Sequence, residues 1–418
     1  MGDSQTDVII VGAGPVGALT ALALAQTGAK VTVLEREPGI VNSPRAAVYF
    51  PSTLLVLEEL GLLDELLDIG FINRTFGTHV PALGYHSVVT TTPIEGIDYD
   101  YQLHVGQHQV ARVALEHAQE LGVDVHFGNE VAGLDDGADG IAVTVRSNGV
   151  DKVLNAKWLI GADGARSTVR KLAGIEFQGH TWPERFVATN VKFDFSRLGY
   201  QQANFVCDPE NMAVIAQLDR DGLWRCTYME DASLPEDSFE ERIHQRYKWF
   251  MQGATDYEIV SASPYMLHQR AAETLRKGHV LLAGDAAHAT NPCGGLGLTS
   301  GVWTGIVLAD VLGAVLHGEE DEAILDRYSD ERRRIFWDIV SPAATENKRM
   351  LQETEPEQRQ KDLAAIRALD EDPDSGAMLM LFAYKVIGNV LRQESRWADA
   401  DPTPRVALDI AAREGQIH

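Results

Sequence analysis

The sequence predicts an α/β protein that combines a parallel sheet with crossover helices, a separate antiparallel sheet and a helical C-terminal region. Three observations lead to this prediction. The chain opens with an apolar strand, a glycine-rich turn, a helix and a second strand. Two later apolar runs, near residues 160 and 282, also end in polar motifs, and the stretch between them alternates apolar and polar side chains. From Asp321 onward the pattern is helical.

The first strand and its glycine turn predict a phosphate-binding unit. Val8 to Val11 are apolar and mostly β-branched, which is typical of a buried parallel strand. Gly12 permits a tight turn, Gly14 lets the backbone approach a diphosphate, and Gly17 lets the following helix pack closely on the strand.

The predicted helix runs from about residue 16 to residue 27 and starts at Pro15-Val16. Its N-terminal N–H groups suit a diphosphate. A second strand ends at Glu35, which can accept hydrogen bonds from the hydroxyls of an adenosine ribose. Arg36 could meet a 2′-phosphate or stack on adenine. This unit alone does not separate FAD from NAD.

Two further motifs follow predicted strands, so they should lie at the carboxyl edge of the same sheet. The first contains Asp163 and Arg166. The second contains Asp285, which can accept a hydrogen bond from a ribityl hydroxyl or cap a helix. Pro292 and a glycine-rich segment then lead into a helix over about residues 298–316, whose N-terminal amides suit an anionic ring.

Together, these motifs resemble the group A flavoprotein monooxygenases, the family of 4-hydroxybenzoate hydroxylase and the phenol and polyketide hydroxylases. The resemblance implies a Rossmann-type FAD-binding domain with an interleaved antiparallel β-sheet substrate domain. It also implies FAD contacts in Pro44-Arg45-Ala46 and in the segment that contains Gln107. The residues expected to bind FAD are Gly12, Gly14, Pro15, Val16, Gly17, Glu35, Arg36, Arg45, Ala46, Gln107, Asp163, Asp285, Pro292, Gly295, Gly297, Leu298 and Thr299.

The predicted organisation is discontinuous. Residues 1–70, 101–183 and 268–345 are assigned to the FAD-binding domain, residues 71–100 and 184–267 to the substrate-binding β domain, and residues 346–418 to a helical C-terminal region. Within these regions we expect one amphipathic helix over residues 52–67 and an exposed acidic loop over residues 370–374.

The resemblance implies an FAD-dependent, NAD(P)H-consuming monooxygenase that hydroxylates a phenolic or heteroaromatic ring through a flavin C4a-hydroperoxide. O2 and NADPH or NADH are the expected co-substrates, and no protein acid or base is assigned. A flavin-bound reductase or oxidase of a lipid or quinone-type precursor is the alternative. A flavin halogenase is less favoured, since no two tryptophans stand two residues apart.

The substrate region departs from the hydroxybenzoate pattern. Where that pattern has a serine and an arginine that grip a carboxylate, this chain has Ala216 and Leu218, which predicts a mainly apolar pocket. Arg225 is a candidate anion anchor or an exposed strand arginine. Candidate phenol-orienting residues are His79, Tyr85, His86, Tyr200 and Tyr228.

The net charge and the cysteine content of the sequence limit the kinds of binding partner that we expect. A net charge of −25 argues against nucleic acid and anionic membranes. Three cysteines without paired spacing imply neither disulfides nor a metal site, which fits a cytoplasmic enzyme. We expect no membrane span, and a monomer or homodimer whose partner is a small aromatic molecule.

Overall fold

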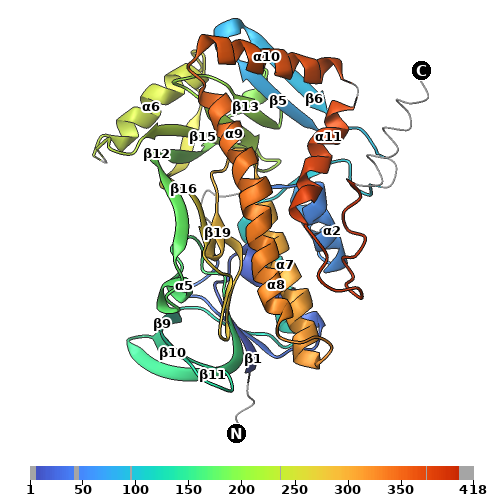
Figure 1. Cartoon of the computed structure of the whole chain (residues 1–418). Helices are drawn as coiled ribbons and strands as arrows, with labels where there is room; N and C mark the ends of the chain where they lie inside the picture. Colours follow the sequence, from blue (N-terminus) through green and yellow to red (C-terminus); the bar gives the residue numbers. More distant parts are fainter. Residues whose placement is uncertain (1–5, 42–46, 95–96, 236, 373, 404–418) are drawn as a thin grey trace, which may run out of the picture.

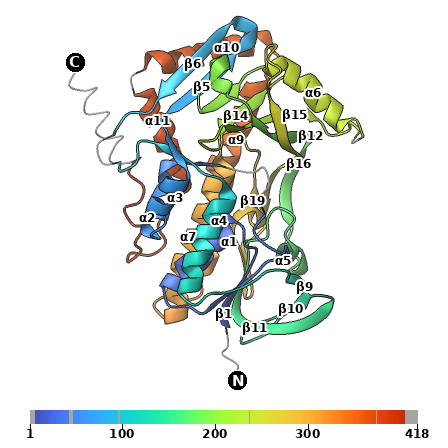
Figure 2. The ribbon, with the colours of Figure 1, turned by 180° about the vertical axis from the view of Figure 1, so that it is seen from behind.

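The computed structural model describes residues 6–41, 47–94, 97–235, 237–372 and 374–403. Its architecture is α/β, as predicted. Figures 1 and 2 show one sheet region at the end near the N-terminus, a second sheet region at the opposite end, and long helices running between the two.

The first sheet is mostly parallel and contains the predicted strand, turn and helix. Its strands, in spatial order, are β17 (Arg276–Lys277), β18 (Val280–Leu282), β11 (Val150–Gly161), β1 (Thr6–Val11), β2 (Val31–Leu34) and β8 (Asp124–His126). The ribbon strands β9 (Glu130–Asp136) and β10 (Ile141–Ser147) extend from β11. Helix α1 (Pro15–Gln26) packs against both α4 (Gln107–Glu120) and α7 (Leu296–His317). Adjacent β18, β11, β1 and β2 are parallel, so their carboxyl ends share one edge.

The second sheet combines two separate chain segments. Its strands, in spatial order, are β19 (His288–Ala289), β16 (Glu258–Ala272), β12 (Phe177–Lys192), β15 (Leu223–Asp231), β14 (Ala213–Gln217), β13 (Ala203–Val206), β5 (Thr75–Val80) and β6 (Tyr85–Thr90). All pairs are antiparallel except β13 with β5, so the purely antiparallel prediction is corrected at the junction of the two segments. Strands β12 and β16 contain the predicted domain borders at residues 183 and 268, and the division into domains stays a prediction.

The two faces of this sheet pack against different helices. Alternate side chains point to opposite faces of a strand. On the outer face, Val187, Trp224 and Cys226 form a core with Tyr247 and Phe250 of α6 (Phe239–Phe250). On the other face, here called the inner face, Phe186, Phe205, Val214 and Met229 pack with residues of α9 (Ser341–Gln352) and α10 (Pro356–Glu371).

The C-terminal region is helical through residue 386. Helix α8 (Ile324–Ile335) continues through a π-helical turn, η4 (Phe336–Val340), into α9, and Figure 1 shows them as one long column. The turn precedes Pro342, which has no N–H to donate to the preceding turn, so a register shift there is expected. Helix α11 (Ser375–Phe382) and the turn η5 (Ala383–Val386) follow.

Two local predictions need correction. The segment 52–67 forms two helices, α2 (Pro51–Glu59) and α3 (Leu63–Ile69), because Gly61 adopts a φ of 76° and ends the first. The predicted acidic loop begins inside α10, where the Asp370 carboxylate accepts hydrogen bonds from Tyr85 and Ser87. A helix that covers the inner face therefore replaces the first part of that loop.

The remaining elements of the described chain are a small sheet and four short helices. Strands β3 (Val48–Tyr49), β7 (Gln102–His104) and β4 (Phe71–Asn73) form a small third sheet. The short helices are α5 (Thr168–Leu172), η1 (Pro81–Leu83), η2 (Phe195–Leu198) and η3 (Gly284–Ala286).

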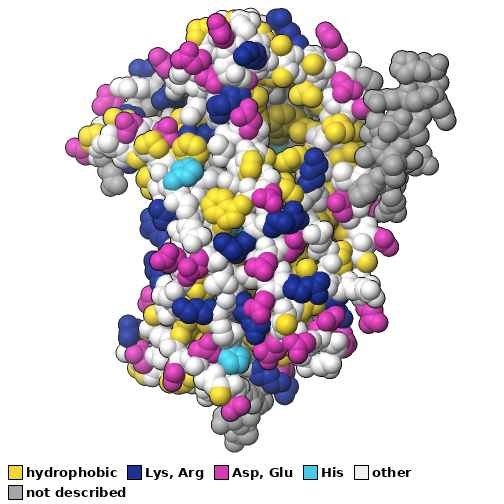
Figure 3. Space-filling view, viewed as in Figure 1, with side chains coloured by type: hydrophobic (Ala, Val, Ile, Leu, Met, Phe, Trp, Pro, Cys, Tyr) yellow, Lys and Arg dark blue, Asp and Glu magenta, His cyan; other side chains and the backbone are white. Residues whose placement is uncertain are grey.

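Helix α7 is long and apolar enough to cross a membrane by length and composition alone. However, 83% of its most apolar window is buried inside the protein, as in a core helix. On the face seen in Figure 3, acidic and basic side chains are intermixed.

Candidate functional site

The three sequence motifs meet at the carboxyl edge of the first sheet. Ala162 N donates to Val11 O at 2.8 Å, and Ala283 N donates to Gly161 O at 2.9 Å. Gly12 N donates to Leu34 O at 2.8 Å, which places the end of β2 at the same edge. The side of Gly284 that lacks a Cβ faces Val16, so the first and third motifs are in contact. Residues more than two hundred positions apart therefore form one continuous edge.

The glycines of the first motif have different reasons to be glycine. Gly12 has a φ of 109°, and a Cβ there would lie 2.4 Å from Ala162 O. A Cβ on Gly17 would lie 2.0 Å from Gly12 O. Gly14 is the N-cap of α1 before Pro15, and a Cβ on it would have no heavy atom within 4 Å. Protein packing explains the first two glycines, whereas the space beside Gly14 suits a group from outside the chain, such as a diphosphate.

Glu35 lies beside this turn. Its Oε2 accepts a hydrogen bond from Ala13 N at 2.8 Å, and its Oε1 accepts one from Glu37 N at 2.9 Å. A carboxylate has about four acceptor positions, so two can still accept from ribose hydroxyls. Arg36 is exposed and pairs with Glu37 at 3.2 Å.

In the second motif, the side chain of Asp163 makes its hydrogen bonds within the motif itself. Asp163 accepts hydrogen bonds from Ser167 Oγ at 2.5 Å and from Thr168 N at 2.7 Å, which holds the first turn of α5. Asp285 is exposed within η3, directly after β18. The carboxylate of Asp163 is therefore largely occupied within the protein, whereas Asp285 lies on the surface of the shared edge.

The third motif shapes the start of α7. Gly295, its N-cap, has a φ of 69° and contacts the Phe50 ring, and Gly297, Leu298 and Thr299 lie in the first turns. Pro292 lies just before this loop. Gln107 is the first residue of α4. Arg45 and Ala46, the other predicted cofactor contacts, lie outside the described residues.

A group of basic side chains lies beside the second motif. It consists of Arg166, Arg170, His268 and Arg270, with the last two on β16. Burial lowers the pKa of His268, and the charges of Arg270, Arg166 and Arg170 lower it further. Arg270 Nε is buried and makes no hydrogen bond to any described residue. This basic cluster suits an anionic ligand.

The inner face of the second sheet contains a further candidate. Arg225 Nε donates to Asn190 Oδ1 at 3.1 Å, and Ala216 is its partner across β14. Of the predicted phenol-orienting residues, Tyr85 packs on the inner face, whereas His79 contacts the rings of His86 and Tyr200 and Tyr228 packs in the outer-face core. The Tyr85 hydroxyl donates to Asp370.

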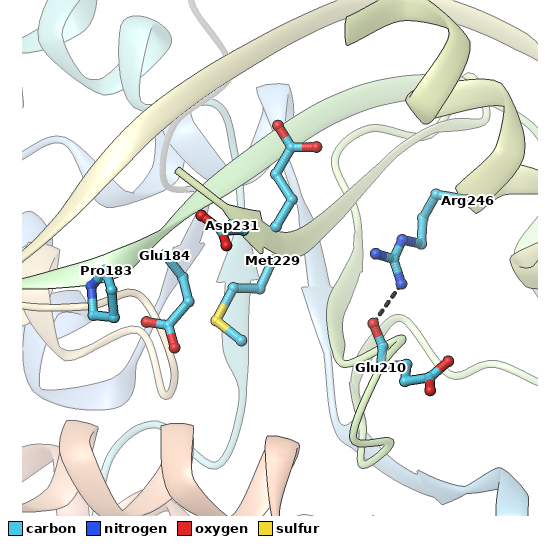
Figure 4. A pocket seen from close by; sticks show the side chains of 7 residues that line it. Pro183, Glu184, Glu210, Met229, Asp231 and Arg246 are labelled. Atoms are coloured by element: carbon cyan, nitrogen blue, oxygen red, sulfur yellow. Dashed lines mark hydrogen bonds between the residues drawn. The ribbon is translucent and has the colours of Figure 1, made fainter. Parts of the chain in front are cut away.

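An open pocket of about 500 Å³ lies beside this sheet (Figure 4). Its lining includes Glu184, Glu210, Glu230 and Asp231, and the dashed line in Figure 4 joins Arg246 to Glu210. None of the predicted cofactor residues lines this pocket. The strand-end edge, where the predicted cofactor residues meet, is therefore the better cofactor site.

Sequence reasoning missed the cluster residues His268 and Arg270. They stand two positions apart on one strand, just before the third motif, so they share a face. That spacing was visible in the sequence, but the approach of Arg166 and Arg170 from another strand end was not.

Comparisons with known proteins agree with this geometry. The profile of a family described as "FAD binding domain" matches residues 5–343. The chain is 42% identical over 374 residues to para-nitrophenol 4-monooxygenase of Pseudomonas sp. (strain WBC-3), covering 87% of this chain and 92% of the relative. It is 40% identical over 371 residues to 6-hydroxy-3-succinoylpyridine 3-monooxygenase HspB of Pseudomonas putida (strain DSM 28022 / S16), covering 88% and 94%.

A solved structure is similar over nearly the whole fold. The crystal structure of p-nitrophenol 4-monooxygenase PnpA from Pseudomonas putida DLL-E4 superposes with a TM-score of 0.87 at 39% identity. The match covers 92% of this chain and 99% of that one. Both sheets and the C-terminal helices therefore have counterparts in a known enzyme.

Proposed function

This chain belongs to the FAD-dependent aromatic monooxygenases, and from that membership we propose that it oxygenates a hydroxylated six-membered ring at a carbon that carries a second substituent. The two relatives near 40% identity are named for such positions: carbon 4 of para-nitrophenol and carbon 3 of 6-hydroxy-3-succinoylpyridine. In both names, the hydroxyl stands across the ring from the oxygenated carbon.

The composition of the inner face supports this substrate class. Phe186, Phe205 and Val214 present apolar surface, and Ala216 stands where a carboxylate-gripping site has a polar side chain. Arg225, on the neighbouring strand, stands opposite Ala216. Such a face suits a compact ring with one strongly polar end, and it favours phenols and hydroxypyridines over 4-hydroxybenzoate.

Oxygenation at a substituted carbon has a defined outcome. For a nitro substituent, a C–O bond forms and the C–N bond then breaks. The electron pair of that bond leaves with the group as nitrite, and the ring hydroxyl loses its proton, which yields a quinone. The second oxygen atom of O2 becomes water with two electrons from the reduced nicotinamide.

The residues at the strand-end edge fit FAD. Glu35 would hold the adenosine ribose, the backbone at Gly14 the diphosphate and Asp285 the ribityl chain, while the first turn of α7 faces the pyrimidine ring. Bound FAD supplies electron transfer from the nicotinamide to O2 and delivery of one oxygen atom to the ring. The protein orients the ring and excludes water.

The substrate proposal can be tested by product analysis. We expect the purified protein to be yellow and to oxidise NAD(P)H faster when 4-nitrophenol or a 3-substituted 6-hydroxypyridine is added. Nitrite should form in step with the coenzyme consumed. The matched comparison is phenol, which has no second substituent. If phenol is turned over well and 4-nitrophenol yields hydroxylated nitrophenol without nitrite, oxygenation occurs at an unsubstituted carbon and the proposal is wrong.

The basic cluster is the proposed docking site for the diphosphate of the reduced nicotinamide. Replacing Arg270 with methionine removes a charge-assisted hydrogen bond of about 1.5 to 3 kcal/mol, so coenzyme affinity should fall roughly tenfold to a hundredfold. Rapid-mixing measurement of flavin reduction at several coenzyme concentrations gives this affinity. Arg146→Met is the matched control, because Arg146 is exposed and pairs with Asp151. Equal coenzyme affinity in both variants would exclude this docking site.

A further inference from the structure

One arginine on the inner face has no acidic partner. Arg225 on β15 makes one side-chain hydrogen bond, from Nε to Asn190 Oδ1 of β12 at 3.1 Å. Among the described residues, no carboxylate forms a salt bridge with it, and its two Nη atoms donate to no described group. Its side chain is partly buried, and this burial lowers the pKa of Arg225 to about 10. It therefore stays charged at neutral pH.

A charge in such a position is costly unless an anion accompanies it. Taking a guanidinium out of water carries an energetic penalty that a paired, hydrogen-bonded anion offsets. Other buried arginines of the described chain have acceptors for both Nη atoms or a carboxylate partner. Arg170 and Arg332 donate to backbone carbonyl oxygens, and Arg185 pairs with Glu230 at 2.7 Å. No carboxylate of the described residues supplies this anion for Arg225, so a ligand is the candidate source.

The strand neighbours of Arg225 on the inner face are small. Its cross-strand neighbour on β14 is Ala216, and Ala188 is two positions from Asn190 on β12. Tyr265 of β16 lies opposite Phe186, and it interacts electrostatically with Arg225. Small side chains thus border the guanidinium, with an aromatic side chain nearby.

The charged and titratable groups around Arg225 come from two elements, β16 and α4. Tyr265 approaches from β16 and His108 from the first turn of α4. Burial lowers the pKa of His108, and the charges of Arg112 and Arg225 lower it further, so the ring is neutral at neutral pH. His108 adjoins Gln107, a predicted flavin contact, and its ring lies over Gly106. No carboxylate is among these groups.

We propose that Arg225 binds the ring hydroxyl of the aromatic substrate as an oxyanion, and that the neutral His108 accepts the proton released. The O–H bond breaks, its electron pair stays on the ring oxygen, and the proton passes through His108 to solvent. An oxyanion raises the electron density at the para carbon, which favours attack on an electrophilic oxygen. This assignment rests on the proposed function, because it requires a hydroxylated ring at this site.

The test uses 4-nitrophenol, whose two protonation states absorb at different wavelengths. Oxidised, FAD-loaded protein is titrated with it between about pH 5 and pH 9. The pKa of the bound phenol should be about one unit or more below that of free 4-nitrophenol, which corresponds to a tenfold preference for the oxyanion. In Arg225→Gln this shift should disappear and phenolate affinity should fall roughly tenfold to a hundredfold.

Three comparisons keep the test specific. 4-Nitroanisole cannot ionise, so its affinity should be the same in Arg225→Gln and the parent protein. Arg225→Lys keeps the charge and should keep part of the shift, which controls for a folding defect in the glutamine variant. His108→Asn should keep the shift but slow proton release, which a pH indicator reports in rapid mixing.

The possible failures are distinguishable. If the parent protein binds 4-nitrophenol in its neutral form, or if Arg225→Gln keeps the shift, the oxyanion assignment is wrong while the proposed function stands. If Arg225→Gln loses FAD and leaves phenol ionisation unchanged, Arg225 serves the cofactor and the assignment is wrong. If FAD-loaded protein binds no phenol or hydroxypyridine, the proposed function fails and the assignment fails with it.

Discussion

Replacing Gly12 with alanine should destabilise the protein by about 2 to 6 kcal/mol, because two separate costs add. Gly12 has a φ of 109°, which an L side chain rarely adopts, and the new Cβ would lie 2.4 Å from the carbonyl oxygen of Ala162. That oxygen belongs to the second motif, so the backbone of one motif must move away from the other. Urea unfolding of the FAD-free protein measures the loss.

Gly14→Ala is the matched control within the same turn. Gly14 has a φ of −71°, which alanine adopts readily, and no heavy atom lies within 4 Å of the new Cβ. The FAD-free protein should therefore unfold within about 1 kcal/mol of the parent. FAD affinity should fall at least about tenfold, because the methyl group occupies the approach of the diphosphate. A Gly14→Ala variant that binds FAD normally would show that the diphosphate does not approach here.

Glu230→Gln should have a comparable effect in the second sheet. The Glu230 carboxylate is 3% exposed and pairs with Arg185 at 2.7 Å and with Arg242 at 2.9 Å. Glutamine has nearly the same shape but no charge, so two largely buried guanidinium groups lose their common counterion. Breaking such an arrangement costs about 3 to 5 kcal/mol. Asp151→Asn, in an exposed pair with Arg146, should change the free energy of unfolding far less, because water and salt screen that pair.

For the Glu230→Gln variant we also expect a pH-dependent difference in stability from the parent protein. Burial alone would raise the pKa of Glu230, but hydrogen bonds from Arg242 and Arg185 outweigh it and lower this pKa below 4.5. A carboxylate with a lowered folded pKa stabilises the protein fully above its unfolded pKa, and that contribution is lost as the pH falls through the folded value. The stability gap between parent and Glu230→Gln should therefore narrow below about pH 4.5. A constant gap down to about pH 3 would show that the charge of Glu230 is not the cause.

Much of the first sheet could be predicted because its signals are local. The helix expected over residues 16–27 is α1 over Pro15–Gln26, and the strand expected to end at Glu35 is β2 over Val31–Leu34. The segment 52–67 was harder: its apolar spacing continues across Gly61, whereas the chain turns there. The spacing of apolar residues predicts which face of a helix is buried, but it does not predict whether the helix continues or is interrupted by a turn.

The candidate cofactor edge follows from the same local rules, since parallel strands bring their carboxyl ends together. The arrangement of the substrate-binding side does not follow from these local rules. From the sequence alone, Arg225 could be an exposed strand arginine or an anion anchor. Only the pairing of β15 with β12 and β14 places it on the inner face, away from α6. The role of Asp370 likewise depends on α10 reaching Tyr85 across almost three hundred residues.

The sequence by itself determined the α/β class, the three motifs and the flavin family, because glycine conformations and strand-turn-helix spacing are properties of neighbouring residues. Only the tertiary structure decided which side chains face the substrate and which of them lack a counterion. Burial and charge compensation depend on groups that arrive from distant strands and helices. The desolvation of Arg225 and the proximity of His108 are therefore features of the folded chain rather than of any segment within it.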